Sequence, residues 1–352
     1  MKGIKVGNKI SKYPIIQGGM GVGVSMHRLA GNVSKEGGIG IISTADIGYQ
    51  EEDFAKTPMK ANLRAIGKEI KKAREIAGED KIIGVNIMVA LKNYSEIVKE
   101  CVKQKIDLII SGAGLPIELP EYVKGSTTKI APIVSSLRSC KLIVKQWMKK
   151  YNYVPDMIVI EGPKAGGHLG FKNEELEGTS EPELENITIE VVDYIKEIEK
   201  ETGKDIPVIA AGGIWDSKDI KKFMDLGAAG VQMATRFVAT DECDASMEFK
   251  QAYVNAKKED VKIIKSPVGL PGRAIKNNFI KQVEKEKCKI DRCYSCIKTC
   301  NLMTTPYCIT KALINSVKGE TDNGLIFCGS NVSRIKEIVS VHNLMQELVC
   351  EL

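Results

Sequence analysis

The stretch that decides the fold of this chain is MIVIEGPKAGGHLG, residues 157–170. Its apolar start predicts a buried strand, and four glycines follow within residues 161–170. Glycine lets a backbone turn sharply and lets a ligand come close to it. His168 stands among these glycines and is one of only three histidines in the chain. An imidazole on such a loop is a candidate acid, base or electrophile, although a surface turn with an incidental histidine also fits these residues alone.

The same pattern, an apolar run that leads into glycine or polar residues, recurs along the chain. The predicted strands lie at residues 15–21, 38–43, 81–88, 107–112, 129–135, 156–160, 206–213 and 230–235. The predicted helices lie between them, at residues 26–36, 60–78, 94–104, 138–150, 187–202 and 217–226. Continuous apolar strands that alternate with helices are typical of a parallel sheet. A count of eight favours a closed (β/α)8 TIM barrel over an open doubly wound sheet.

The loops that follow the last two predicted strands suggest a phosphate site. Gly212 and Gly213 follow the seventh strand, and Ala234 and Thr235 follow the eighth at the start of a helix. Backbone N–H groups in such positions can point together at one anion, although tight turns without a ligand have the same composition. No glycine fingerprint of a dinucleotide fold follows an early strand. We therefore expect a mononucleotide phosphate.

The composition is that of an ordinary globular protein, with 352 residues, 43% of them hydrophobic and 27% charged. A net charge of +6 is a weak excess that does not argue for nucleic acid. No apolar run reaches the roughly 18 residues of a membrane span. The N-terminus shows no signal peptide, so we expect a cytoplasmic protein whose ten cysteines are thiols or metal ligands rather than disulfides.

Five motifs resemble, in chain order, those of the nitronate monooxygenase (2-nitropropane dioxygenase) superfamily, which also includes the flavin-dependent enoyl-ACP reductase II. They are PIIQGGM at 14–20, GVNIM at 84–88, AGGHLG at 165–170, PVIAAGGI at 207–214 and VQMATRF at 231–237. The resemblance extends from about residue 10 to about residue 280. It implies an FMN-binding barrel at residues 1–240 and a smaller, mostly helical lid at residues 241–352.

The resemblance also implies a role for each matching residue. The FMN phosphate is expected on Gly212, Gly213, Gln232, Met233, Ala234 and Thr235. The isoalloxazine ring is expected against Gly18, Gly19 and Met20, with Asn86 and Glu161 as hydrogen-bond partners, and with Gly166 and Gly167 allowing the loop to approach. His168 is expected to be catalytic. Two positions depart from the pattern. Glu161 stands where nitronate monooxygenases commonly have a glutamine, and a glutamate at this position resembles the reductase branch. Ala234 stands in place of a glycine.

Two enzymatic functions fit this site. An FMN-dependent nitronate monooxygenase oxidises alkyl nitronates with O2 to a carbonyl compound and nitrite, and an enoyl-ACP reductase II passes hydride from NAD(P)H through FMN to an enoyl thioester. His168 serves both reactions, and Glu161 favours the second. A flavin- or metal-binding redox sensor and a phosphosugar enzyme of the same fold are further alternatives. A small-molecule substrate and a possible homodimer are expected, without nucleic acid or membrane partners.

The C-terminal third contains a Cys-rich segment, residues 288–308, with spacing C-x4-C-x2-C-x3-C-x7-C. Cys288, Cys293, Cys296 and Cys300 form a candidate metal or iron–sulfur site, because similar spacings bind clusters and C-x2-C is shared with zinc sites. A reduced, Cys-rich helical cap is the alternative. Residues 266–274 predict a turn-rich crossing and residues 332–352 a final amphipathic helix. We expect His27 and His342 near the surface, and Lys164 and Arg236 as solvated charges.

Overall fold

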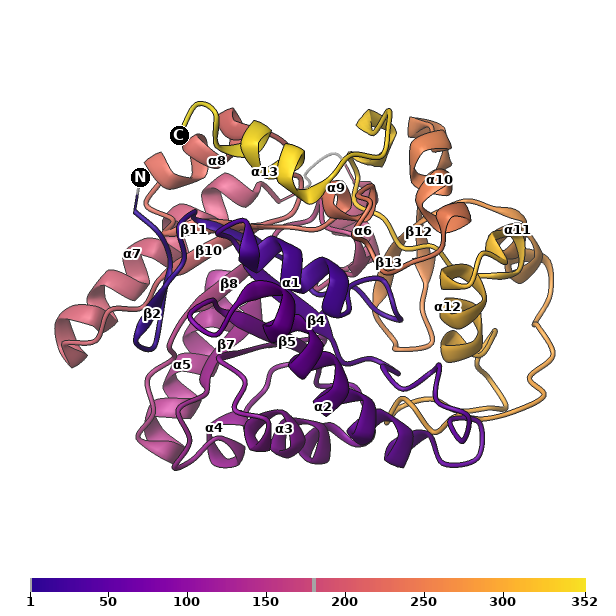
Figure 1. Ribbon diagram of the computed structural model, residues 1–352, viewed down its shortest axis with the longest axis horizontal. Helices are drawn as coiled ribbons and strands as arrows, with labels where there is room; N and C mark the ends of the chain where they lie inside the picture. Colours follow the sequence, from indigo (N-terminus) through magenta and orange to yellow (C-terminus); the bar gives the residue numbers. More distant parts are fainter. Residues whose placement is uncertain (1, 179–181) are drawn as a thin grey trace.

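The computed structural model describes residues 2–178 and 182–352, and eight of its strands form a closed parallel barrel (Figure 1). The barrel strands are β3 (Ile15–Gln17), β4 (Ile39–Ser43), β5 (Ile83–Met88), β6 (Leu108–Gly112), β7 (Lys129–Val134), β8 (Ile158–Glu161), β10 (Val208–Ala211) and β11 (Gly230–Met233). They follow one another in this order around the barrel, and β11 closes it by pairing with β3, where Gln232 lies opposite Ile16. The predicted TIM barrel is therefore confirmed.

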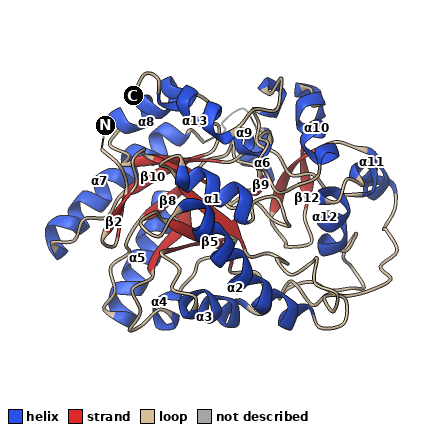
Figure 2. Ribbon diagram, viewed as in Figure 1, coloured by secondary structure: helices blue, strands red, loops and turns tan. Residues whose placement is uncertain are grey.

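Helices surround the barrel strands, as the secondary-structure colours of Figure 2 show. They are α1 (His27–Lys35), α2 (Pro58–Ala77), α3 (Tyr94–Lys103), α4 (Leu119–Tyr122), α5 (Leu137–Tyr151), α7 (Leu184–Thr202) and α8 (Ser217–Asp225). The six predicted helices are all present, with ends shifted by at most a few residues. The sequence does not predict α4, because it is a single turn and contains a proline.

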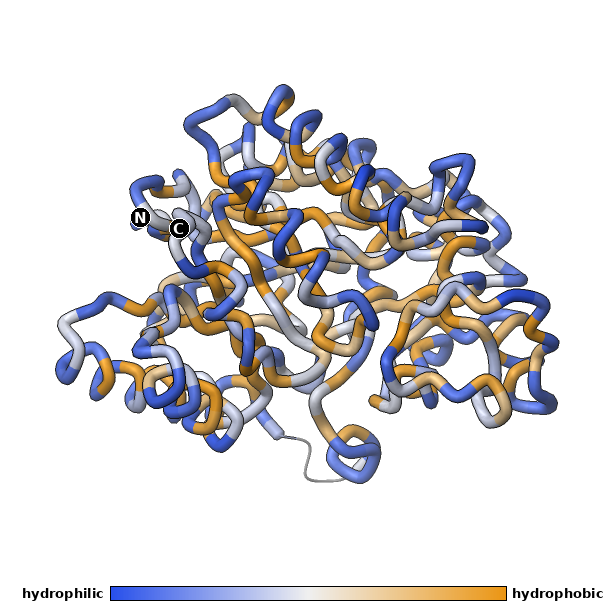
Figure 3. The backbone as a smooth tube through the Cα atoms, turned by 90° about the horizontal axis from the view of Figure 1, so that it is seen from below, coloured by the Kyte–Doolittle hydropathy of each residue, from blue (hydrophilic) through white to orange (hydrophobic). Residues whose placement is uncertain are grey.

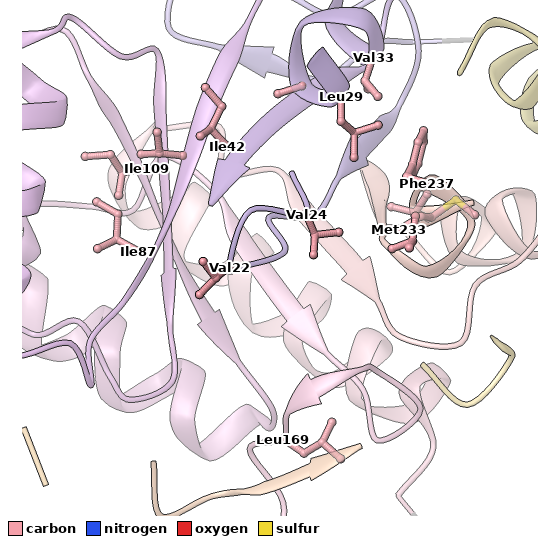
Figure 4. Close-up of a cluster of buried hydrophobic side chains, with 14 of the residues drawn as sticks. Val22, Val24, Leu29, Val33, Ile42, Ile87, Ile109, Leu169, Met233 and Phe237 are labelled. Atoms are coloured by element: carbon pink, nitrogen blue, oxygen red, sulfur yellow. The ribbon is translucent and has the colours of Figure 1, made fainter. Parts of the chain in front are cut away.

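The barrel strands are buried on both faces, which explains why they are apolar without alternation. Ile41 lies in a core cluster inside the barrel, whereas the next residue, Ile42, lies in the cluster between the strands and the helices. Figure 4 shows Ile42 grouped with Ile87 and Ile109 of the neighbouring strands. In Figure 3 the hydrophobic colour follows the inner strands, and the outer helices alternate between the two colours, as amphipathic helices do.

The chain after the barrel forms a cap over one side of it. Its elements are α9 (Thr235–Val238), α10 (Met247–Asn255), β12 (Val261–Lys265), β13 (Pro271–Ile275), α11 (Asn278–Lys285), α12 (Ile309–Val317) and α13 (Val341–Val349), with short 3-10 turns at Lys258–Asp260, Thr321–Asn323 and Val332–Arg334. The expectation of a turn-rich segment at residues 266–274 is wrong in part. Residues 271–275 form β13, which pairs with β12 in an antiparallel hairpin. Short strands in a lid are not visible as a repeating pattern in the sequence.

The hairpin is joined to the barrel by β9 (Gly167–His168), which pairs antiparallel with β13. A two-stranded hairpin of β1 (Lys5–Val6) and β2 (Lys9–Ile10) precedes the barrel, and α6 (Asn173–Glu177) follows β9. The strand that carries the central glycine loop is therefore continued by a cap sheet. This pairing fixes the loop between the two parts of the molecule.

The last helix is shorter than expected and returns to the barrel. α13 begins at Val341, where Ser340 accepts a hydrogen bond from the Asn343 N–H, and it packs against α1 and α8 beside the N-terminus (Figure 1). Just before it, Val339 pairs with Thr240 at the expected domain boundary. The division at residue 240 stays a prediction. Within residues 2–178 and 182–352, no helix has the length and apolar character needed to cross a membrane.

Candidate active site

The C-terminal ends of the barrel strands and the cap enclose one cavity of about 240 Å³. Every catalytic and cofactor-binding residue that the sequence predicts lines this cavity. From the barrel these are Gly18, Gly19, Met20, Asn86, Glu161, Gly166, Gly167, His168, Gly212, Gly213, Gln232, Met233, Ala234 and Thr235. They come from the ends of five strands, which is where catalytic residues of this architecture lie. The structure thus brings the predicted residues together, and what each of them binds stays a prediction.

At the end of the cavity near β10 and β11, two glycines have backbone angles that favour glycine. Gly212 and Gly213 have φ angles of +104° and +84°, which L-residues with side chains rarely adopt. Ala234 has a φ of −129°, so the alanine that replaces a glycine there is unstrained. The backbone therefore requires glycine at positions 212 and 213 but not at position 234.

A cap segment that the sequence does not single out closes this end. The Gly329 N–H donates to Thr235 Oγ1 at 3.2 Å, and Asn331 Nδ2 donates to the Gly213 carbonyl at 2.8 Å. Ser330, between them, has a buried hydroxyl oxygen without a hydrogen-bond partner. The only signal in the sequence is a Gly-Ser-Asn tripeptide, which also describes an ordinary turn.

The cavity fits a flavin on two observations. The side-chain oxygen of Gln232 and the hydroxyl of Ser330 are buried in its wall without partners, and native proteins rarely leave such groups unsatisfied. The floor at Gly19 also leaves no room for a side chain, because an added Cβ would lie 2.4 Å from the Asn86 Cβ. A flat polar ligand on a glycine floor would satisfy the first observation and explain the second.

His168 is held by the cap hairpin. Its Nε2 lies 2.7 Å from Ser266 Oγ, and its ring stands edge-on to Phe327 with 4.9 Å between centroids. Ser266 Oγ also accepts a hydrogen bond from the Val268 N–H at 3.3 Å, which leaves the Ser266 O–H free to donate to Nε2 of His168. Because Nε2 then acts as the acceptor, we assign the ring proton to Nδ1. Burial lowers the pKa of His168 to about 4. The imidazole is therefore neutral at physiological pH.

Glu161 ends β8 at the cavity wall. Burial raises the pKa of this carboxyl to about 8, so it holds its proton at neutral pH. A protonated carboxyl offers one donor and one acceptor, much as a glutamine amide does. Glu161 can therefore make the hydrogen bonds of the glutamine that is common at this position in nitronate monooxygenases.

The loop between Glu161 and His168 is tied to the cap by a buried arginine. Arg273 of β13 donates to the carbonyls of Pro163 at 2.6 Å and Ala165 at 2.5 Å. Gly166 packs so closely on the chain at Cys328 that an added Cβ would lie 2.5 Å from its carbonyl carbon. These contacts fix the approach of the loop to the cavity.

The other charged residues named from the sequence lie in ion pairs or at the rim. His27 Nδ1 lies 2.6 Å from Glu69, and His342 Nδ1 lies 2.9 Å from Glu36, both away from the cavity. The expectation that Arg236 is a solvated charge is wrong, because only 13% of its side chain is exposed. Its guanidinium group donates two hydrogen bonds to Glu347 of α13 and lies over the ring of Trp215. Lys164 lines the cavity.

The arrangement of the cysteine segment lends no support to the metal site that the sequence suggested. In the described residues, 2–178 and 182–352, no group of three or more His, Cys, Asp or Glu side chains is placed to hold a metal ion. The segment is also irregular rather than helical. A metal or iron–sulfur site on Cys288, Cys293, Cys296 and Cys300 stays a prediction.

Comparisons with known proteins agree with this geometry. The family described as "Nitronate monooxygenase" matches residues 5–351. A probable nitronate monooxygenase of Staphylococcus saprophyticus is 30% identical over 76% of this chain and 77% of its own. The structure of FabK from Thermotoga maritima superposes with a TM-score of 0.73 at 26% identity, over 97% of this chain and 93% of that one.

A nitroalkane oxidase from Streptomyces ansochromogenes has the same fold, with a TM-score of 0.70 at 19% identity, over 97% of this chain and 96% of that one. Proteins of this family and its structural neighbours are in general flavin-dependent. The match to the family covers nearly the whole chain and includes both the barrel and the cap. This chain is therefore an oxidoreductase that belongs to the nitronate monooxygenase family.

Proposed function

We propose that this protein is an FMN-dependent enzyme that oxidises alkyl nitronates with O2 to a carbonyl compound and nitrite. The observation that carries the proposal is His168, a neutral imidazole in the wall of a cavity whose floor is glycine. Family membership and the S. saprophyticus relative support the substrate class.

The residues of the chain have separate tasks in this reaction. Bound FMN supplies the electron acceptor and the site of reaction with oxygen. Gly212, Gly213 and Thr235 would hold its phosphate, and Gly18 and Gly19 would support its ring. An alkyl nitronate has already lost its α-proton, and Nε2 of His168 accepts from Ser266, so His168 would donate a hydrogen bond from its Nδ1–H to the nitro oxygens.

A second function is favoured by one residue and one comparison. Glu161 matches the reductase branch, and the T. maritima FabK structure is similar over nearly the whole chain. In this alternative the protein is an NAD(P)H-dependent enoyl-ACP reductase II, FMN is reduced by NAD(P)H, and His168 places a proton on the enoyl thioester. The same cavity would accept the thioester.

The two functions are separated by what reduces the flavin. We would record the anaerobic absorption spectrum of the purified protein, add ethylnitronate, NADH or NADPH to separate samples, and then admit air. Reduction by the nitronate alone, followed by nitrite release in air, is the expected result. Prompt bleaching by NAD(P)H, with oxidation by an enoyl thioester, would establish the alternative instead. A protein that binds no flavin even when FMN is added would overturn both.

A further inference from the structure

The part of the cavity beside His168 is lined by apolar side chains of the cap. They come from α10, from α12 and from the segment that forms a bridge to β13 at Phe327. We call them the apolar wall, and they are Phe249, Tyr253, Leu313, Leu325 and Phe327. The tasks assigned above to the residues of the reaction leave this wall without a role.

Contacts join the apolar wall into one surface that begins at the imidazole. Phe327 stands edge-on to His168, and its carbonyl accepts a hydrogen bond from the Tyr253 hydroxyl. The Tyr253 ring lies 5.7 Å from that of Phe249, one turn earlier on α10. Leu325 and Phe327 are two positions apart, and both line the cavity, as alternate residues of an extended chain do.

The barrel contributes apolar side chains to the same part of the cavity. Val22 and Val24 lie on the loop after β3, as Figure 4 shows, and Ala45 follows β4. The Asp244 N–H donates to the Val24 carbonyl at 3.2 Å, which places Val24 near the start of α10. These barrel residues and the apolar wall together form what we call the apolar chamber.

The hydroxyl groups that α10 and α12 bring to the cavity are already used by the protein. The Tyr253 O–H donates to the Phe327 carbonyl, and the Ser316 O–H donates to the Leu325 carbonyl at 2.7 Å. An ionised carboxylate can only accept hydrogen bonds. Neither hydroxyl is therefore available to a carboxylate in the apolar chamber.

The cations of the cavity lie near its β10 and β11 end. Among the described residues that line the cavity, only Lys164 and Arg236 are lysine or arginine. Lys164 adjoins Gly213, where an added Cβ would lie 2.9 Å from the Lys164 Cβ, and Arg236 is paired with Glu347. A carboxylate in the apolar chamber would therefore be buried without a cation, which is costly.

We propose that the apolar chamber binds a neutral hydrocarbon chain of the substrate and rejects a chain that carries a carboxylate. This inference rests on the proposed function for the reacting group, which would lie at His168, while the chain would extend along Phe327 toward Leu325 and Leu313. Longer alkyl nitronates should then be better substrates than ethylnitronate. A nitronate with a carboxylate at the far end of its chain should be a poor one.

The test uses the flavin-loaded protein and ligands that do not react. A carboxylate group is a planar anion like a nitronate group, so straight-chain monocarboxylates probe the chain, and a dicarboxylate adds a charge at its far end. Binding is measured from the change in flavin absorption and by calorimetry. We expect the affinity to rise about fourfold per methylene from propionate to hexanoate. Adipate, which has the same chain length as hexanoate, should bind at least about 100-fold more weakly.

Two substitutions of a wall residue form a matched pair. Leu313 is half-buried, and Leu313→Ala should enlarge the chamber, so that the tightest binding moves to a longer monocarboxylate while the flavin content stays the same. Leu313→Met keeps the side-chain volume and should keep the wild-type preference. Leu325→Ala, on the neighbouring segment, gives the same test if Leu313→Ala does not fold.

Three results would overturn the proposal. One is adipate that binds as tightly as hexanoate, and another is wild-type affinity that does not depend on chain length. The third is an unchanged preference in folded Leu313→Ala or Leu325→Ala protein. Failure of the proposed function gives a different result, because binding is measured without turnover. A protein that prefers hexanoate but oxidises no nitronate would lose the proposed reaction and keep the apolar chamber.

Discussion

The floor and the wall of the cavity are built in different ways. The floor consists of glycines and amides at the ends of barrel strands: Gly19 lies two residues after β3, and Gln232 lies near the end of β11. The wall consists of cap residues, among them Phe327 and Ser330, which reach the cavity from segments far along the chain, and Ser266 contacts it through His168. The floor therefore depends on a repeating scaffold, and the wall depends on individual long-range contacts.

This difference separates two tasks. A rigid floor of backbone atoms suits the flavin on which proteins of this family in general depend. A wall built from a hairpin and a returning segment can change without disturbing the barrel, so we expect it to decide substrate and rate. His168 lies where the two meet, on β9 between the barrel loop and β13. The predictions below test this division, beginning with the residue at the junction.

Replacement of the junction residue should have the largest effect. His168→Ala removes the only imidazole in the cavity and should lower turnover by about 10²–10⁴-fold, the usual contribution of a general acid or base. Flavin content, measured from the visible spectrum, should be unchanged, because the floor is intact. His342→Ala, exposed and paired with Glu36, is the control and should be as active as the wild type. Full activity of His168→Ala would remove this residue from the mechanism.

The second effect concerns a wall residue that we expect to serve the cofactor. Ser330→Ala removes a buried hydroxyl that has no protein partner. If this hydroxyl donates to the FMN phosphate, its loss should weaken FMN binding by roughly 10- to 100-fold, the range for one hydrogen bond to a charged group. Fluorescence titration of the flavin-free protein with FMN measures it, and Ser333→Ala is the nearby control. Unchanged affinity would show that the cap takes no part in holding the phosphate.

The third effect concerns the orientation of the imidazole. Ser266→Ala removes the hydroxyl that lies 2.7 Å from His168 Nε2. We expect kcat to fall about tenfold, a small part of the loss on deleting a general acid or base, while KM and FMN affinity stay the same. Because the lost O–H favours the neutral ring, the acid limb of the pH profile should move to higher pH. Ser266→Thr should restore both values, and a variant that lost kcat without this shift would indicate a merely structural role.

The barrel and the site floor could be predicted from the sequence for the same reason. The strands are short and mostly buried, and five of them carry candidate site residues at or just after their ends, so a local pattern such as Val208–Gly213 carries fold and site together. The hairpin of β12 and β13 escaped prediction because its residues are only partly buried along β12 and show no clear alternation. The parts played by Ser266 and Ser330 depend on contacts between distant segments. One chain without its structure carries no signal for such contacts.

The smallest effect at neutral pH, and the one that bears on both functions, is expected from Glu161→Gln. The protonated carboxyl of Glu161 and the amide of glutamine offer similar hydrogen bonds, so turnover at pH 7 should change by no more than about twofold. Above pH 8 the carboxyl of Glu161 loses its proton, so the activity of the wild-type protein should fall while that of Glu161→Gln does not.

The folded state holds this proton between the usual glutamate pKa of 4.5 and about 8, whereas the unfolded state releases it. The wild type should therefore lose thermal stability relative to Glu161→Gln as the pH rises through that window, and melting temperatures measured at pH 5, 6.5 and 8 would check this. Parallel profiles for the two proteins would mean that Glu161 is already ionised at neutral pH, and its likeness to the glutamine of nitronate monooxygenases would then no longer hold.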